Sequence, residues 1–258
     1  MEHPARTMAL VILGLAFPFT TSVPAVTGPK YEFPSNTSAG VHLELKETSR
    51  EKVGKVTYVY YQLSGSGFTP GKTLNLYQWV WTLKDGILAQ SGYLVEDSGN
   101  VVCSKQQSGD DQEAKRWCQS TLDETKLAAA GFQRGQVFRV GVISADGEQK
   151  AFVETIPFPI EIEENGCRLH AERLSENADS WFIVGDGFKP GDSVHYSIKG
   201  PGNTQEGDAK LSDKGGLAFM IKPPSSGTLS GSATVKVEAS TCKPVLRFKW
   251  GTSAIELP

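Results

Sequence analysis

The sequence has few of the residues that most often carry catalysis or bind metals. Its 258 residues include only 4 cysteines and 4 histidines, and no two cysteines have the CxxC spacing. His3, His42, His170 and His195 complete no zinc-like spacing with them, so we expect no metal site. The GxSxG motif of a nucleophile elbow is also missing. We therefore expect a protein that is not an enzyme and that holds no cofactor.

Long hydrophobic runs and an excess of one charge are missing too. The net charge is −3, with 26 basic and 29 acidic side chains, so no overall basic field favours nucleic acid as a partner. The apolar run from Met8 to Phe19 has 12 residues. A helix that crosses a membrane needs about 20. We expect no permanent membrane span.

The amino terminus has the pattern of a secretory signal peptide. Arg6 precedes the apolar run, and Val23-Pro24-Ala25 resembles a small-x-small cleavage site. This predicts a signal peptide over residues 1–25 and a Pro/Gly/Ser-rich flexible linker over 26–39. The alternatives are a buried strand and an uncleaved anchor. The expected location is secreted, either periplasmic or extracellular.

One motif occurs twice. Gly65-Ser66-Gly67-Phe68-Thr69-Pro70-Gly71 returns 120 positions later as Gly185-Asp186-Gly187-Phe188-Lys189-Pro190-Gly191. A repeat with a fixed offset predicts that one fold is used twice, and we place the two domains at residues 40–162 and 163–258. Glycine tolerates unusual backbone angles and Pro-Gly favours a tight turn, so each copy predicts a corner between two strands.

Short segments of alternating hydrophobicity surround both copies of the motif. Val41, Leu43 and Leu45 alternate with polar residues, and Leu246, Phe248 and Trp250 do so near the end of the chain. A period of two residues between turn signals is typical of half-buried strands. The sequence therefore predicts an all-β protein.

The GxGFxPG motif followed by an alternating strand resembles the immunoglobulin-like modules of secreted and surface-attached bacterial proteins. The resemblance implies two tandem immunoglobulin-like antiparallel β-sandwich domains. Such modules serve as spacers, adhesin stalks, carbohydrate-binding accessories and assembly partners, so the fold alone assigns no activity. The resemblance transfers no functional residue to this chain.

The cysteines lie two in each half, as expected for a secreted protein. The simplest of the three possible pairings joins Cys103 to Cys118 and Cys167 to Cys242. The first bridge would close an insertion over residues 103–131. Thr121 and Glu124 have the spacing of a capping box before the Ala-rich segment 127–130, so we expect a short helix that ends at Gly131.

The candidate site is aromatic. Alignment of the two copies places Leu74 and Leu76 on the core side of a strand, which puts Tyr77, Trp79 and Trp81 on the opposite face. An apolar outer face indicates a surface that binds a glycan or a protein. The alternative is that the insertion or the second domain covers these rings.

The favoured interpretation is a secreted, non-enzymatic binding protein of the cell envelope or extracellular space. A structural or assembly protein, such as a stalk or subunit that pairs through strand edges, is the alternative. A hydrolase is a third interpretation, for which the sequence offers no catalytic constellation.

Overall fold

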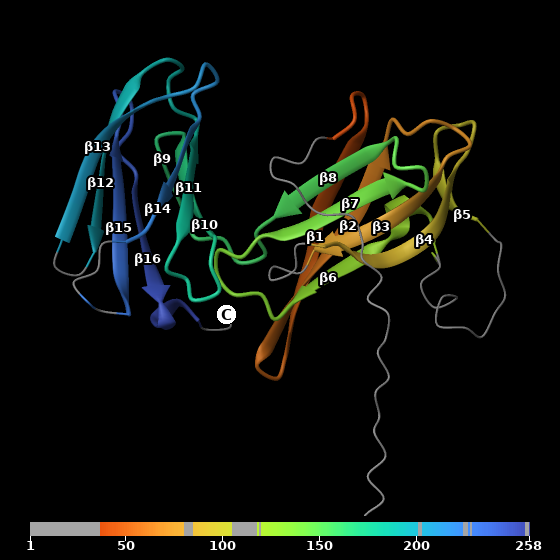
Figure 1. Ribbon diagram of the computed structural model, residues 1–258, viewed down its shortest axis with the longest axis horizontal. Helices are drawn as coiled ribbons and strands as arrows, with labels where there is room; N and C mark the ends of the chain where they lie inside the picture. Colours follow the sequence, from red (N-terminus) through yellow and green to blue (C-terminus); the bar gives the residue numbers. More distant parts are fainter. Residues whose placement is uncertain are drawn as a thin grey trace, which may run out of the picture.

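The computed structural model describes residues 37–79, 85–104, 118, 120–200, 203–223, 227, 229–255 and 258 (Figure 1). The predicted signal peptide, the linker up to residue 36 and Trp81 lie outside these described residues. Within them, no helix is both long and apolar enough to cross a membrane.

Strands β1 to β8, here called the N-terminal half, form two antiparallel sheets. One has the strand order β1-β2-β6 and the other the order β5-β4-β3-β7-β8. Their bounds are β1 (His42–Val53), β2 (Val56–Ser66), β3 (Thr73–Trp79), β4 (Ile87–Val95), β5 (Val101–Cys103), β6 (Lys126–Ala130), β7 (Phe138–Ser144) and β8 (Lys150–Thr155).

Strands β9 to β16, the C-terminal half, also form two sheets. Their orders are β14-β11-β10-β9 and β13-β12-β15-β16. The bounds are β9 (Glu161–Glu164), β10 (Cys167–Arg173), β11 (Trp181–Asp186), β12 (Ser193–Gly200), β13 (Asn203–Lys210), β14 (Leu217–Ile221), β15 (Ser230–Glu238) and β16 (Val245–Gly251). Helical structure in the described ranges is limited to the short turns η2 (Leu122–Glu124) and η3 (Thr252–Ala254).

The two halves have the same strand order. The sheet β1-β2-β6 corresponds to β10-β11-β14, and β8-β7-β3-β4 corresponds to β16-β15-β12-β13. The strand pairs are antiparallel throughout. This confirms the all-β prediction, and the repeat in sequence is matched by a repeat in topology.

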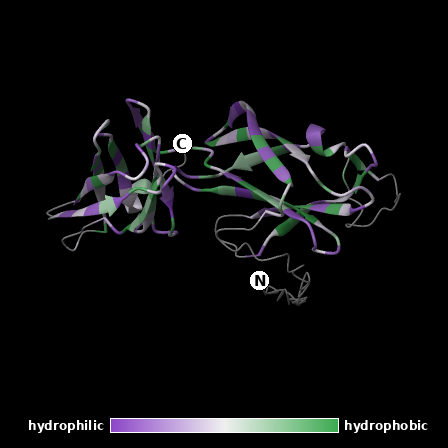
Figure 2. Ribbon diagram, turned by 90° about the horizontal axis from the view of Figure 1, so that it is seen from above, coloured by the Kyte–Doolittle hydropathy of each residue, from purple (hydrophilic) through white to green (hydrophobic). Residues whose placement is uncertain are grey.

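Each half encloses a hydrophobic core of its own. The core of the N-terminal half runs from Val41 to Phe158, and that of the C-terminal half from Cys167 to Trp250. Figure 2 shows hydrophobic and hydrophilic residues alternating along the strands of both halves. This alternation lets each sheet bury one face, as the period of two residues predicts.

The repeated motif forms the corner that the sequence predicts. In the first copy it links β2 to β3, and in the second it links β11 to β12. Gly67 has φ +82°, and a Cβ atom there would lie 1.9 Å from the carbonyl oxygen of Gly40. Gly187 has φ +77°, and its Cβ would lie 2.0 Å from the oxygen of Gly166. Glycine is therefore required at both positions for a steric reason as well as a conformational one.

The predicted helix after Thr121 is limited to one 3-10 turn, η2, and its predicted continuation over residues 127–130 is wrong. Residues 126–130 form β6, which pairs with β2 and places Leu127 opposite Tyr61. Leu127 and Ala129 are buried while Lys126 and Ala128 are exposed, so the segment follows the period of a strand. Pairing and burial thus override the helix propensity of alanine. β6 also occupies the position of β14, so this part of the segment 103–131 belongs to the sandwich itself.

Matched glycine substitutions test the corner. We expect Gly67→Ala to lower the free energy of unfolding by about 3 kcal/mol, from left-handed strain plus the clash with Gly40. Gly71→Ala meets the same strain, at φ +81°, but has no heavy atom within 4 Å of the added Cβ. It should cost only about 1 kcal/mol. Guanidinium unfolding of both variants measures the difference, and equal costs would contradict the steric argument.

Candidate functional site

Tyr77 and Trp79 lie on the outer face of β3, as the alignment of the repeats predicts. Leu74 and Leu76 belong to the core of the N-terminal half, whereas Trp79 packs against Phe152 with 5.9 Å between ring centroids. Phe152 comes from β8, two strands away across β7. Gly141 of β7 lies between them, opposite both Tyr77 and Phe152 in the sheet register.

Trp79 is nevertheless buried, which contradicts an exposed ring at this position. Only 2% of its surface is accessible. The indole lies over Gly141, where an added Cβ would come within 2.9 Å of the ring, and beside Gly86, where it would come within 2.8 Å. The absence of two side chains thus makes room for the indole. The sequence pattern did not identify Phe152, Gly86 or Gly141 as its neighbours, because each lies on a different segment.

A smaller apolar surface remains on this face. Tyr77 is half-buried and its ring centroid lies 6.2 Å from that of Trp79. Leu88 of β4 is its neighbour across the strands and is also half-buried. Leu94, further along β4, is 36% exposed. We call Tyr77, Leu88 and Leu94 the outer apolar face. The third predicted aromatic, Trp81, lies outside the described residues.

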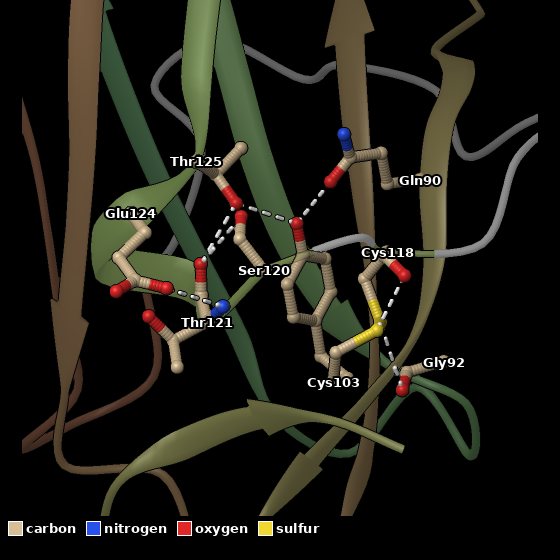
Figure 3. The surroundings of a disulfide bond; sticks show 9 residues. Gln90, Gly92, Cys103, Cys118, Ser120, Thr121, Glu124 and Thr125 are labelled. Atoms are coloured by element: carbon tan, nitrogen blue, oxygen red, sulfur yellow. Dashed lines mark hydrogen bonds between the residues drawn. A yellow bond between two sulfur atoms is a disulfide. The ribbon is translucent and has the colours of Figure 1, made fainter. Parts of the chain in front are cut away.

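Both predicted disulfides are present. Cys103 bonds to Cys118, and Cys167 bonds to Cys242. Figure 3 shows the first bridge beside the turn that contains Thr121 and Glu124. The Glu124 carboxylate accepts a hydrogen bond from the Thr121 backbone amide at 3.3 Å, as expected of a capping box. Residues 105–117, inside the loop that the bridge closes, lie outside the described residues.

A buried arginine joins the two halves. Arg173 is 2% exposed and ends β10, and its Nη1 donates to the side-chain oxygen of Gln133 in the loop between β6 and β7. Its Nε donates to the carbonyl oxygen of Ser175 at 2.8 Å, and its Nη2 donates to that of Glu176. Burial lowers the pKa of the guanidinium, and the nearby Glu176 opposes this shift. Its hydrogen bonds offset the cost of removing the charge from water.

The same loop packs its backbone against a tryptophan. The Arg173 amide donates to the carbonyl oxygen of Gly135 at 2.7 Å. A Cβ atom on Gly135 would lie 2.7 Å from the ring of the fully buried Trp181. Gly135 therefore allows the N-terminal half to approach β11 closely. A cavity of about 620 Å³ opens beside this contact, with Arg134 and Trp181 among its walls.

Clusters suited to a metal ion are absent from the ranges that the structure describes. Two histidines pair instead with single carboxylates. His170 Nε2 lies 3.1 Å from Glu172, and the exposed His195 Nδ1 lies 3.0 Å from Asp208. This hydrogen bond raises the pKa of His195. Both pairs join residues on neighbouring surface positions, and neither includes a nucleophile.

A double-mutant cycle tests the packing of Trp79. Trp79→Ala should lower the free energy of unfolding by about 3–5 kcal/mol, because it empties a filled site. Tyr77→Ala should cost about 1 kcal/mol. The cycle of Trp79→Ala with Phe152→Ala should show a coupling of about 0.5–1.5 kcal/mol. Additive costs, or a cost for Trp79→Ala no larger than that for Tyr77→Ala, would contradict the packing described here.

Comparison with solved structures finds remote likenesses. No protein-family model matches the chain, and no curated protein matches it. A tetra-tandem repeat from the extending region of a large adhesion protein is 9% identical with a TM-score of 0.28, over 82% of this chain. The chain spans 50% of that structure.

Two chicken protein structures give similar values. The interferon gamma receptor alpha chain is 10% identical with a TM-score of 0.22, covering 80% of this chain and 97% of the receptor chain. The CNTN1 FN1–FN3 domains are 11% identical with a TM-score of 0.20, covering 81% of this chain and 64% of theirs. Because the TM-scores are low, these likenesses add no argument about function.

Proposed function

We propose that this chain is a secreted, non-enzymatic binding protein of the cell envelope or extracellular space. The supporting observation is the repeated sandwich topology, in which each half has its own core and its own disulfide. We take the halves as two tandem immunoglobulin-like domains. Disulfides of this kind persist in oxidising compartments, which agrees with export.

The contact between the halves supports a role in which one half holds the binding surface of the other in place. The Arg173–Gln133 hydrogen bond and the packing of Gly135 on Trp181 join the halves through buried groups. The β9 strand precedes Cys167 and pairs with β10, so the chain enters the second sheet as soon as it leaves the first core. A short, docked connection would hold one half at a fixed angle to the other.

We place the partner surface on the outer apolar face. The buried Trp79 packs against Tyr77 of this face. We therefore expect Trp79 to contribute packing and not a direct contact with the ligand. Tyr77 offers an amphipathic ring of the kind that binds sugar rings or protein side chains. The proposed partner is thus a glycan or a protein, and Trp81 remains a predicted contact.

Affinity measurements on surface variants test this proposal. The intact protein is titrated with a panel of neutral and amino-sugar oligosaccharides, followed by saturation-transfer NMR. Tyr77→Ala and Leu88→Ser should each weaken an observed affinity at least about tenfold, a loss of about 1.4 kcal/mol. Ile162→Ser, which removes an exposed apolar side chain from β9, should leave it unchanged. Unchanged affinity in the Tyr77 variant would contradict the hypothesis that the outer apolar face binds glycans. Binding of a protein partner would then be tested with the same variants.

The alternative is an assembly subunit that pairs through a strand edge, and β14 favours it. Two other edges, β9 and β8, are protected. β9 presents Glu161, Glu163 and Glu164, and the amides of Lys150 and Phe152 on β8 donate to the hydroxyls of Ser38 and Thr37. β14, with the sequence Leu-Ala-Phe-Met-Ile, has no charge, and Met220 is 70% exposed. Uncharged, regular edges are the ones that pair with other strands.

The β14 sequence is also self-complementary. If two copies pair antiparallel about Phe219, each Ala218 faces a Met220 and each Leu217 faces an Ile221. The double variant Ala218→Cys/Met220→Cys should then form a disulfide-linked dimer under mild oxidation. Each single variant should not, because identical positions lie about 7 Å further apart along the strands. Non-reducing gels measure the outcome, and a monomer by light scattering at all concentrations would contradict pairing.

A further inference from the structure

A second aromatic surface lies on the other sheet of the N-terminal half. Val59 and Tyr61 of β2 are buried in the core, so the alternate residues Tyr58 and Tyr60 belong to the outward face of the sheet β1-β2-β6. The ring centroids of Tyr58 and Tyr60 lie 6.3 Å apart, and the ring planes differ by 17°. The two rings are therefore nearly parallel neighbours on one face of the sheet.

The Tyr60 ring leans across the sheet toward β1. Its hydroxyl donates to the Glu51 carboxylate at 3.3 Å. Glu51 lies opposite Tyr58 in the register, so this contact joins diagonal neighbours on adjacent strands. Both tyrosines are half-buried, as expected of rings that lie along a sheet and do not project from it. Each ring can then present one of its faces to a ligand.

Small side chains border the rings on the other side. On β6, Ala130 lies opposite Tyr58 and Ala128 lies opposite Tyr60, and both alanines are exposed. β6 is the edge of this sheet, and no further strand in the described ranges pairs with it. A methyl group is too short to cover a neighbouring ring. We call Tyr58, Tyr60, Ala128 and Ala130 the tyrosine platform.

Polar side chains of both charge signs surround the tyrosine platform. Glu51 borders it on β1. At the next outward position of β2, Lys46 and Lys126 lie on either side of Gln62 in the register. The Gln62 side-chain nitrogen donates to the carbonyl oxygen of Asp123 at 2.6 Å, which holds this side chain in place. A border with acceptors and donors of both signs suits a ligand that has no net charge and many hydroxyl groups.

The tyrosine platform is a departure from the repeat. At the offset of 120 residues, Tyr58 and Tyr60 correspond to Ala178 and Ser180, which both precede β11. The C-terminal half thus builds the same strand order without aromatic rings at these two positions. The shared fold does not require the tyrosines, which favours a role for them in binding.

We propose that the tyrosine platform binds a neutral oligosaccharide. The apolar faces of successive sugar rings stack on Tyr58 and Tyr60, and the sugar hydroxyls bond to Glu51, Gln62 and Lys126. The inference goes beyond the proposed function, because the outer apolar face belongs to the other sheet and contributes no residue to this site.

Calorimetric titration of the intact protein tests the proposal with three probes. Cellotetraose and chitotetraose are extended chains whose sugar rings present flat apolar faces, and maltotetraose is a neutral chain that curves. We expect one saturable site for cellotetraose or chitotetraose. Maltotetraose should bind at least about tenfold more weakly than the preferred probe, because a curved chain cannot lie along two nearly parallel rings.

Matched variants locate the binding. Tyr58→Ala/Tyr60→Ala should weaken the preferred probe at least about tenfold, whereas Tyr58→Phe/Tyr60→Phe keeps both rings and should stay within about threefold. Ala128→Arg places a long side chain beside Tyr60 without removing a packed group, and should also weaken binding at least about tenfold. Tyr77→Ala should leave the affinity unchanged, which separates this site from the outer apolar face. Circular dichroism confirms that each variant is folded.

Four results would overturn the proposal. They are the absence of saturable binding for cellotetraose and chitotetraose, equal affinity for maltotetraose, undiminished affinity in the folded alanine double variant, and loss of binding in Tyr77→Ala alone. The last would place the saccharide on the outer apolar face, so the two sites are distinguished by the same set of variants.

Discussion

Each sandwich depends on a corner too tight for any side chain. At Gly67 and again at Gly187, the chain passes so close to a neighbouring carbonyl oxygen that even a methyl group would overlap it. Immediately after the corner, Phe68 and Phe188 enter their cores, with 4% and 3% exposure. The corner thus joins the two sheets and also directs an aromatic ring between them. In both halves the strands before and after the corner, β2 and β3 or β11 and β12, lie in different sheets.

The same kind of close approach recurs where the halves meet. Gly135 allows the loop after β6 to contact Trp181, and Arg173 fastens it through hydrogen bonds to Gln133 and to backbone oxygens. Removing a charge from water costs free energy, and the hydrogen-bond partners of Arg173 must stay in place to offset that cost. The cavity lies beside these contacts.

Much of the fold could be predicted from sequence because its signals are local. The period of two residues and the GxGFxPG motif can each be recognised within a short segment. The four cysteines allow only three pairings. The continuation of the helix over residues 127–130 was wrong because the decisive partner of residues 126–130 is β2, more than sixty positions earlier. For Trp79 the alignment of repeats indicated the correct face, but its burial depends on Gly86, Gly141 and Phe152. No local pattern in the sequence indicated the junction cavity, since Arg134 and Trp181 in its walls come from different halves.

The acidic edge strand β9 has a consequence for how such chains could assemble. Glu161, Glu163 and Glu164 lie along one border of the sheet whose opposite border is the uncharged β14. A second sheet that approached β9 with its own glutamates would be repelled, while β14 carries no such barrier. In this sheet, pairing of like edges is therefore favoured at β14 and opposed at β9. Two molecules joined at β14 would form a closed pair, with an acidic β9 at each outer border of the joined sheet.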